Sequence, residues 1–364
     1  MRAVLTVAIC VVAGCSERPS DTTDAQAIVN FYNWFDYIHP DTLPAFTRET
    51  GIRVNYDVFD SDATLEGKLL AGNSGYDLVV PTYTNFARER AAGVFQPVQW
   101  NRLKHAAGLD PYLVAKLAEG DPGNRFGVLH SWGTTGLGFD VDRIRARMSD
   151  APLDSWSLLF DPAIASRFSD CGIALLDSPQ DVLPHALLYL GRDPNSESER
   201  DLEDAMAVIA GIRPFVRYFH QSQFVDDLAN GELCLVLAWS GSVFQALHRS
   251  AGRNLRYVVP REGGVIWFVV MAIPNDAPHV DNAYRLIDYL LRPQVAADFT
   301  DAAFYPSGVA AAEALVAESV RAEEAIYPSP DVRERLHAIH PETPEYQRHR
   351  LRLWTAMKAG GTAD

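Results

Sequence analysis

The chain has 364 residues, 48% of them hydrophobic, and a formal net charge of −15 at pH 7. This length is enough for one large or two medium domains, and the hydrophobic fraction excludes a largely disordered chain. The negative charge argues against nucleic acids and anionic membrane surfaces as partners, but it permits a cationic one.

The N-terminus has the features of an export signal. Arg2 precedes an apolar run from Ala3 to Gly14, which is too short to span a bilayer and has the length of a signal-peptide core. The letters "VAGC" at its end resemble the lipobox of bacterial lipoproteins, which implies cleavage before Cys15 and lipidation of its thiol. An ordinary secretory signal cut near Ala25 is the alternative. We therefore expect a leader and polar tether at 1–25, and a mature protein in the periplasm that is anchored to a membrane.

Short apolar runs alternate with amphipathic segments after this leader. The pattern predicts strands at 27–34, 52–59 and 76–82, and helices at 40–51 and 62–73. Such repetition is typical of a mostly parallel sheet, in which ligands bind beyond the carboxyl ends of the strands. Residues 33–37 end the first strand and Thr82 ends the third, so we expect them to line one crevice.

The rest of the chain predicts a second α/β lobe and a return to the first. Residues 131–144 have the Thr and Gly content of an extended segment between lobes, and 280–304 is a predicted helical pair broken at Pro293. The predicted division is a leader at 1–25, lobe 1 at 26–132 plus 257–306, and lobe 2 at 133–256 plus 307–364.

Four segments of the chain are distinctive in combination: "NWFDYIHPDT", "TTGLGFDVDR", "RYFHQSQFVDDLANGELCLVLAWSG" and "IYPSPDVRERL". Together they resemble the periplasmic polyamine-binding proteins of ABC transporters, of the putrescine-binding type, and the resemblance covers essentially the whole mature chain. It implies the two-lobed α/β fold of type II periplasmic binding proteins, whose discontinuous lobes are joined by a hinge and close on a ligand cleft. It also implies a monomer without enzymatic activity, cofactor or metal, which delivers a small cationic amine to an ABC permease in the inner membrane.

The resemblance also supplies candidate binding residues. Aromatic rings cover the methylenes of a polyamine and attract its ammonium groups. Asp36 and Asp181 are the expected anchors, because an unpaired buried charge is prohibitively costly and a carboxylate neutralises it. The expected ligand-binding set is Trp34, Phe35, Asp36, Tyr37, Thr82, Asp181, Trp239, Ser242, Trp267, Val269 and Tyr305.

Cys171 and Cys234 remain when the cysteines of the leader are set aside. In an exported protein an even pair suggests one disulfide, and two buried free thiols are the alternative. The two cysteines also coincide with a disulfide that the resemblance implies.

The chain departs from the family pattern at three pocket positions. The family has aspartates where this chain has Ser242 and Val269, and a small hydroxyl residue where it has Phe35. We therefore expect weakened or altered diamine affinity. A ligand with one cationic and one neutral end becomes a candidate, such as an acylated or γ-glutamylated polyamine, an agmatine-related compound or an amino acid derivative.

Several other readings of the same residues stay open. Asp36 and Asp181 are also suitable helix caps, Thr82 is a suitable turn hydroxyl, and the tryptophans are suitable core residues. The aspartates of "DVFDSD" lack the spacing of a calcium loop, which favours a strand-to-helix turn with capping. No nucleophile motif, zinc motif or phosphate-binding loop supports an enzyme. A lipoprotein that senses a ligand for a membrane protein would use the same fold, and genomic neighbours would distinguish it from a transport protein.

Overall fold

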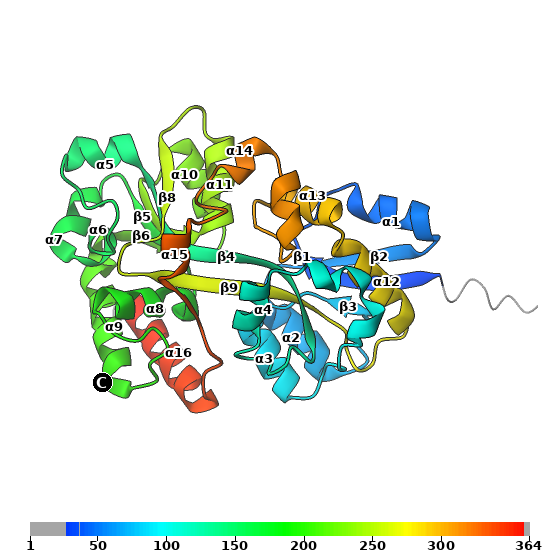
Figure 1. Ribbon diagram of the computed structural model, residues 1–364. Coiled ribbons are helices and arrows are strands. Elements are labelled where there is room, and N and C mark those ends of the chain that lie inside the picture. Colours follow the sequence, from blue (N-terminus) through cyan, green and yellow to red (C-terminus); the bar gives the residue numbers. More distant parts are fainter. Residues whose placement is uncertain (1–26, 36, 360–364) are drawn as a thin grey trace, which may run out of the picture.

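The computed structural model describes residues 27–35 and 37–359. The predicted leader with Cys15, and the predicted anchor Asp36, lie outside the described residues. A mixed sheet runs through the molecule in the order β2-β1-β3-β9-β4-β7-β5-β6, with β10 beside β9 and β8 beside β4 (Figure 1). The strands are β1 (Ile28–Trp34), β2 (Arg53–Phe59), β3 (Leu78–Val79), β4 (Gly127–Asp140), β5 (Ile173–Leu175), β6 (Val216–Phe219), β7 (Leu235–Trp239), β8 (Leu255–Val258), β9 (Gly264–Ala272) and β10 (Leu336–Ala338).

Helices cover both faces of this sheet. They are α1 (Thr42–Thr50), α2 (Asp62–Ala71), α3 (Tyr83–Ala91), α4 (Pro111–Leu117), α5 (Val141–Arg147), α6 (Ser157–Phe160), α7 (Pro162–Ala165), α8 (Pro179–Tyr189), α9 (Glu199–Ile212), α10 (Phe224–Asn230), α11 (Ser240–Arg249), α12 (Val280–Leu290), α13 (Pro293–Ala303), α14 (Glu318–Arg321), α15 (Pro330–Arg333) and α16 (Pro344–Lys358). Short 3-10 turns connect some of them.

The N-terminal strands form the predicted parallel arrangement. β1 pairs in parallel with β2 on one side and with β3 on the other. The helices that connect these strands bury an apolar side chain each, Phe46 from α1 and Leu65 from α2. Helix α1 ends at Gly51, whose φ of 72° is readily adopted only by glycine. The third strand is shorter than predicted, because Pro81 lacks a backbone donor and Thr82, which still forms an isolated bridge with Val269 of β9, is already the N-cap residue of α3.

Two long strands connect the halves of the molecule. β4 is buried along its whole length and pairs antiparallel with β9, β7 and β8. Figure 1 shows β4 and β9 crossing the middle, between the half that carries β1 to β3 and the half that carries β5 to β7. The prediction of an extended segment between two lobes at 131–144 is therefore confirmed for the residues of β4, and α5 begins directly after it.

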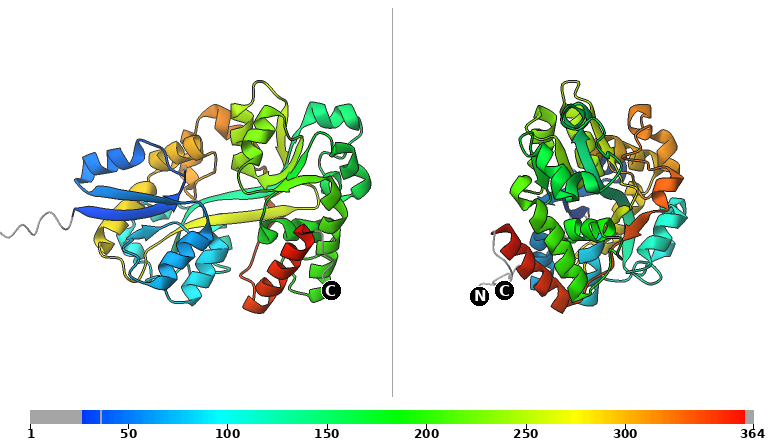
Figure 2. Two further views of the ribbon diagram at one scale, coloured as in Figure 1. Left: turned by 180° about the vertical axis from the view of Figure 1, so that it is seen from behind. Right: turned by 90° about the vertical axis from the view of Figure 1, so that its left-hand side faces the viewer.

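Two separate hydrophobic cores lie on either side of this crossing. The first is built mostly from residues 29–132 and 259–338, and the second mostly from 137–255 together with α16. The left view in Figure 2 shows α16 beside the half that contains the second core. The sequence-based division placed all of 307–364 in lobe 2, whereas apolar side chains of 309–338 pack into the first core. The lobe boundaries themselves stay a prediction.

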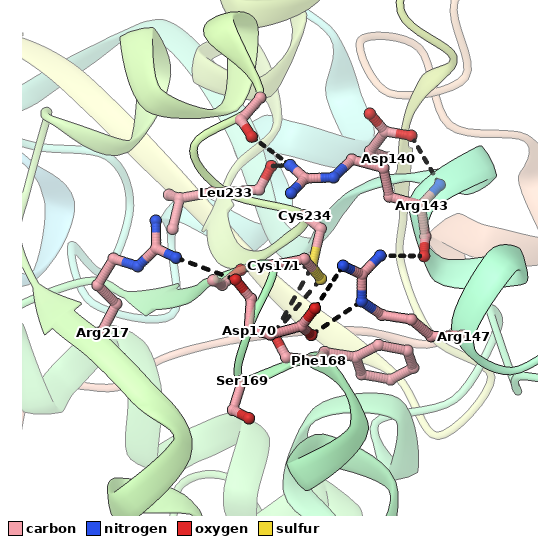
Figure 3. The surroundings of a disulfide bond; sticks show 12 residues. Asp140, Arg143, Arg147, Phe168, Ser169, Asp170, Cys171, Arg217, Leu233 and Cys234 are labelled. Carbon is pink, nitrogen blue, oxygen red and sulfur yellow. Dashed lines mark hydrogen bonds and ion pairs between the residues drawn. A yellow bond between two sulfur atoms is a disulfide. The ribbon is translucent and has the colours of Figure 1, made fainter.

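The predicted disulfide joins Cys171 to Cys234 inside the second core (Figure 3). Cys171 lies just before β5 and Cys234 just before β7, so the bridge joins the starts of two neighbouring parallel strands. Close by, Arg147 forms two hydrogen bonds to the Asp170 carboxylate, of 2.9 and 2.6 Å.

The helical pair α12 and α13 is broken at Pro293 as predicted. No helix within residues 27–35 and 37–359 is both long enough and apolar enough to cross a membrane.

Candidate ligand-binding site

The sheet register places the two predicted tryptophans of β7 and β9 on one face. Trp239 lies directly opposite Thr135 of β4, and Trp267 lies directly opposite Gly133. Directly opposed residues project to the same side of a sheet, and so do residues two apart along a strand. Trp239 and Trp267 therefore project from the same face, although 27 intervening residues separate them along the chain (240–266).

The same face continues into the first half of the molecule. Val269 lies opposite Ser131 of β4 and also forms a bridge with Thr82. The Ser131 hydroxyl shares a hydrogen bond of 2.8 Å with the hydroxyl of Tyr37. Four predicted positions, Tyr37, Thr82, Trp267 and Val269, are thus brought together across the strands at the centre of the sheet.

Trp267 is held by a glycine and a tyrosine. A Cβ atom on Gly133 would lie only 2.3 Å from the indole Cζ2 of Trp267, so the ring occupies the space that a side chain would take. The Tyr305 ring meets Trp267 edge to face, with centroids 5.2 Å apart. The indole N–H of Trp267 is buried and has no hydrogen-bond partner among the described residues.

Hydroxyl groups line the part of the site beside Tyr305. Ser242 and Tyr305 share a hydrogen bond of 2.9 Å, and the rings of Tyr37 and Tyr305 lie 5.6 Å apart. Burial raises the pKa of Tyr37 and raises that of Tyr305 to about 12. Both phenols are therefore neutral near pH 7 and act as hydrogen-bonding groups without charge.

Trp34 is positioned at the end of β1 and is half-buried. Its indole N–H donates to the Val80 carbonyl over 2.8 Å, and its ring packs against Phe59 at 4.5 Å. Phe35, the next residue, leaves 67% of its surface exposed, so the structure does not bring it into the packed part of the site.

Asp181 belongs to the second half and is held by Trp239. The Trp239 indole N–H donates to the Asp181 carboxylate over 3.3 Å. Burial raises the pKa of this carboxyl, while hydrogen bonds from Ser178 and Trp239 and the charge of Arg350 act in the opposite direction. Ser178, and not Asp181, is the N-cap residue of α8, so the alternative role of Asp181 as helix cap is wrong.

Asp62 is a site residue that the sequence analysis missed. The aspartates of "DVFDSD" were expected together to form a strand-to-helix turn with capping, but Ser61 is the N-cap residue of α2. The Asp62 carboxylate instead accepts hydrogen bonds from the hydroxyl and the backbone N–H of Thr82, of 2.8 and 3.3 Å. Thr82 is therefore tied to Asp62 on one side and bridges to Val269 on the other.

Burial and neighbouring charge perturb the Asp62 carboxyl. Burial raises its pKa to about 6, hydrogen bonds from Thr82 and Asn85 oppose the shift, and the charge of Asp181 adds to it. A sequence signal for Asp62 existed, because it follows the end of β2 as Asp36 follows β1 and Thr82 follows β3.

The site therefore combines two half-buried carboxylates, several aromatic faces and neutral hydroxyls. These groups suit a positively charged ligand with an apolar stem. Within the described part of the chain, no group of three or more His, Cys, Asp and Glu side chains is arranged to hold a metal ion.

Comparison with known proteins agrees with this geometry. The family model of the bacterial extracellular solute-binding proteins matches residues 42–326. The putrescine-binding periplasmic protein PotF of Escherichia coli is 43% identical over 341 residues, which cover 92% of each chain. The putrescine-binding periplasmic protein SpuD of Pseudomonas aeruginosa is 41% identical, again over 92% of each chain.

A solved structure is similar along most of the chain. The spermidine/putrescine transporter substrate-binding protein PotD of Streptococcus pneumoniae superposes with a TM-score of 0.80 at 26% identity, covering 91% of this chain and 98% of its own. The predicted two-lobed α/β fold is thereby confirmed, and with it the expectation of a binding protein and not an enzyme. The chain belongs to the family of bacterial extracellular solute-binding proteins.

Proposed function

We propose that this protein captures a polyamine or a related small cationic amine in the periplasm and delivers it to an ABC permease. The observation that carries the proposal is the half-buried carboxylate of Asp181, which accepts a hydrogen bond from the indole N–H of Trp239 on a sheet face that also presents Trp267. A buried carboxylate beside aromatic faces stabilises an ammonium group and covers the methylenes next to it. The relatives PotF and SpuD, named as putrescine-binding proteins, support this ligand class.

In this proposal the ligand lies between the two halves of the molecule. Trp34, Tyr37, Trp239, Trp267 and Tyr305 surround its stem, while Asp36 and Asp181 neutralise its charge. Thr82 and Ser242 supply hydroxyls, and Val269 and Phe35 supply apolar contacts. We further propose that the protein is a monomer whose Cys15 carries a lipid anchor, and that residues 307–338 belong with lobe 1.

Asp181→Asn is expected to weaken amine binding by about 100-fold, since it removes the charge but keeps the shape of the side chain. Isothermal titration calorimetry of ligand-free protein with putrescine, spermidine and agmatine at pH 7.5 measures this loss. The exposed Asp150 lies in the same half, and Asp150→Asn serves as the matched control. The proposal is wrong if the wild-type protein binds none of these amines, or if Asp181→Asn binds them as tightly.

A second candidate is a ligand with only one cationic end. The Ser242–Tyr305 hydroxyl pair, the apolar Val269 and the unpartnered Trp267 indole N–H of the described structure favour it. An indole N–H requires an acceptor, and a second ammonium group offers none. N-acetylputrescine binding more tightly than putrescine in the same calorimetric series would select this candidate, and the reverse order would exclude it.

Gly133→Ala is expected to displace the Trp267 ring, because the added methyl group overpacks a site where such overpacking costs roughly 1–3 kcal/mol. The displaced ring is expected to lower the amine affinity by about 10-fold. The matched control is Gly67→Ala, a helical position where an added Cβ meets nothing within 4 Å. Calorimetry gives the affinities, and circular dichroism shows whether both variants remain folded. Unchanged affinity in a folded Gly133→Ala protein would mean that Trp267 does not contact the ligand.

A further inference from the structure

A buried hydroxyl on the sheet face of the two tryptophans has no partner. Thr135 of β4 lies directly opposite Trp239 of β7, so its side chain projects from the face that also presents Trp267. Thr135 is fully buried, and its hydroxyl forms no hydrogen bond to any residue that the structure describes. A buried hydroxyl without a partner is unfavourable. The described part of the chain therefore leaves this hydroxyl available to a ligand that the site encloses.

The preceding threonine differs in this respect. Thr134 projects to the opposite face of β4, because successive residues of a strand alternate. Its hydroxyl shares a hydrogen bond of 2.8 Å with the hydroxyl of Tyr257. A Cβ atom on Gly136 would also lie 2.8 Å from that Tyr257 oxygen, as expected if 134 and 136 share a face. Of these two adjacent threonines, one is satisfied within the protein and the other is not.

Two connections place Thr135 at the Asp181 end of the site. Trp239, opposite Thr135 on β7, donates its indole N–H to the Asp181 carboxylate over 3.3 Å. Val265, opposite Thr135 on β9, donates its backbone N–H to Nε2 of His185 over 3.3 Å. The other ring nitrogen of His185, Nδ1, lies 2.7 Å from the Asp181 carbonyl oxygen. Thr135 thus lies between two residues that both connect to Asp181.

The surroundings of the Asp181 carboxylate leave room for a ligand ammonium group. His185 is neutral near pH 7, because burial lowers its pKa to about 4. Arg350 acts on Asp181 as a positive charge, but it forms its own ion pair with Glu342 at 2.9 Å. A carboxylate has about four acceptor positions. Hydrogen bonds from Trp239 and Ser178 therefore leave some of these positions free.

The number of N–H groups on the ligand decides whether it can use both Asp181 and Thr135. A protonated primary amine has three N–H donors, as the lysine ammonium group does. It can donate to the Asp181 carboxylate and still donate to the Thr135 oxygen. A protonated tertiary amine has one N–H donor and cannot do both.

We propose that the Thr135 hydroxyl accepts a hydrogen bond from the protonated primary amine that Asp181 anchors. Thr135 is then a specificity-determining residue, which selects primary amines over N-alkylated ones. The inference rests on the proposed function and deepens it, because it names the class of amine that the Asp181 end of the site takes.

The test compares wild type, Thr135→Val and the matched control Thr134→Val. Valine keeps the shape of threonine and lacks the hydroxyl. Thr135→Val is expected to lower putrescine affinity by about 10-fold in calorimetry at pH 7.5, while the urea midpoint of the ligand-free protein stays unchanged or rises. Thr134→Val breaks the bond to Tyr257, so it is expected to lower the urea midpoint and to leave the affinity unchanged.

A second measurement separates ligand contact from a merely structural role. The preference of the protein for putrescine over N,N,N′,N′-tetramethylputrescine is expected to shrink by about 10-fold in Thr135→Val, because only the primary amine loses a hydrogen bond. A structural role would lower both affinities together and leave their ratio unchanged. Thr135→Ser and Thr135→Ala form a further pair that differs only in the hydroxyl, and the serine variant is expected to bind putrescine more tightly.

The outcomes separate this inference from the proposed function. A wild type that binds no amine refutes the proposed function itself. A wild type that binds putrescine, with the same affinity and the same preference in Thr135→Val, leaves the proposed function intact and overturns the role of Thr135. Equal putrescine affinity of Thr135→Ser and Thr135→Ala would overturn it as well.

Discussion

Replacement of both Cys171 and Cys234 by alanine is expected to lower the free energy of unfolding by about 4 kcal/mol. The disulfide closes a loop across a sequence separation of 63 residues, and the loss follows from the entropy that this closure removes from the unfolded chain. Both sulfur atoms are fully buried, so alanine also leaves small cavities in the second core. Urea denaturation followed by tryptophan fluorescence measures the change.

Reduced wild-type protein is the natural control for the cysteine variant, because it loses the covalent bond without any change of sequence. Its stability is expected to match that of the double variant. Amine binding is expected to survive in both, since the disulfide lies at the start of β7 and Trp239 at its end. A double variant as stable as oxidised wild type, within about 1 kcal/mol, would contradict the assignment.

Glu89→Gln is expected to stabilise the protein at neutral pH and to remove most of a pH dependence that the wild type shows. Glu89 is only 1% exposed, and neither carboxylate oxygen has a hydrogen-bond partner among the described residues. Burial raises its pKa to about 8, and the charges of Asp62 and Glu66 add to the shift. The folded protein therefore keeps this carboxyl protonated in a range where the unfolded chain ionises it.

The direction of the pH effect follows from this difference. Between the ordinary glutamate pKa and about 8, the folded state binds more protons than the unfolded state, so stability falls as the pH rises. The contribution of Glu89 is expected to fall by about 3 kcal/mol between pH 5 and pH 7.5. Thermal or urea denaturation at the two pH values measures it, and the exposed Glu324, as Glu324→Gln, is the control. Parallel pH profiles for wild type and Glu89→Gln would contradict the prediction.

The pattern of elements could be predicted from local sequence, because the periodicity and the caps act over short distances. The helix over 42–50 ends at the glycine that the sequence indicates, and the helical pair breaks at Pro293. The length of the third strand was overestimated, because its apolar residues continue to Val80 while its pairing with β1 stops at Val79. Packing of 309–338 into the first core could not be predicted either, since it depends on contacts with distant parts of the chain.

The aromatic part of the site was predicted, whereas one of its acids was not. Trp239 and Trp267 stand in recognisable motifs, and the strand register then places them on one face. Asp62 is one of three aspartates that were interpreted together as a strand-to-helix turn with capping. Its actual partner, Thr82, is 20 residues away, and Asp181 lies in the other half of the molecule. The place of Asp62 after the end of β2 was a signal for the site, but its contact with Thr82 follows from the tertiary fold.

The site between the two cores is proposed to bind a small molecule through the positive charge of that molecule. Calorimetry of ligand-free wild type with putrescine, and with 1,4-butanediol as its uncharged counterpart, tests the claim most directly. We expect clear binding of putrescine that weakens as salt is added, and no detectable binding of the diol. Equal binding of the two compounds, or binding of neither putrescine nor any other amine, would contradict it.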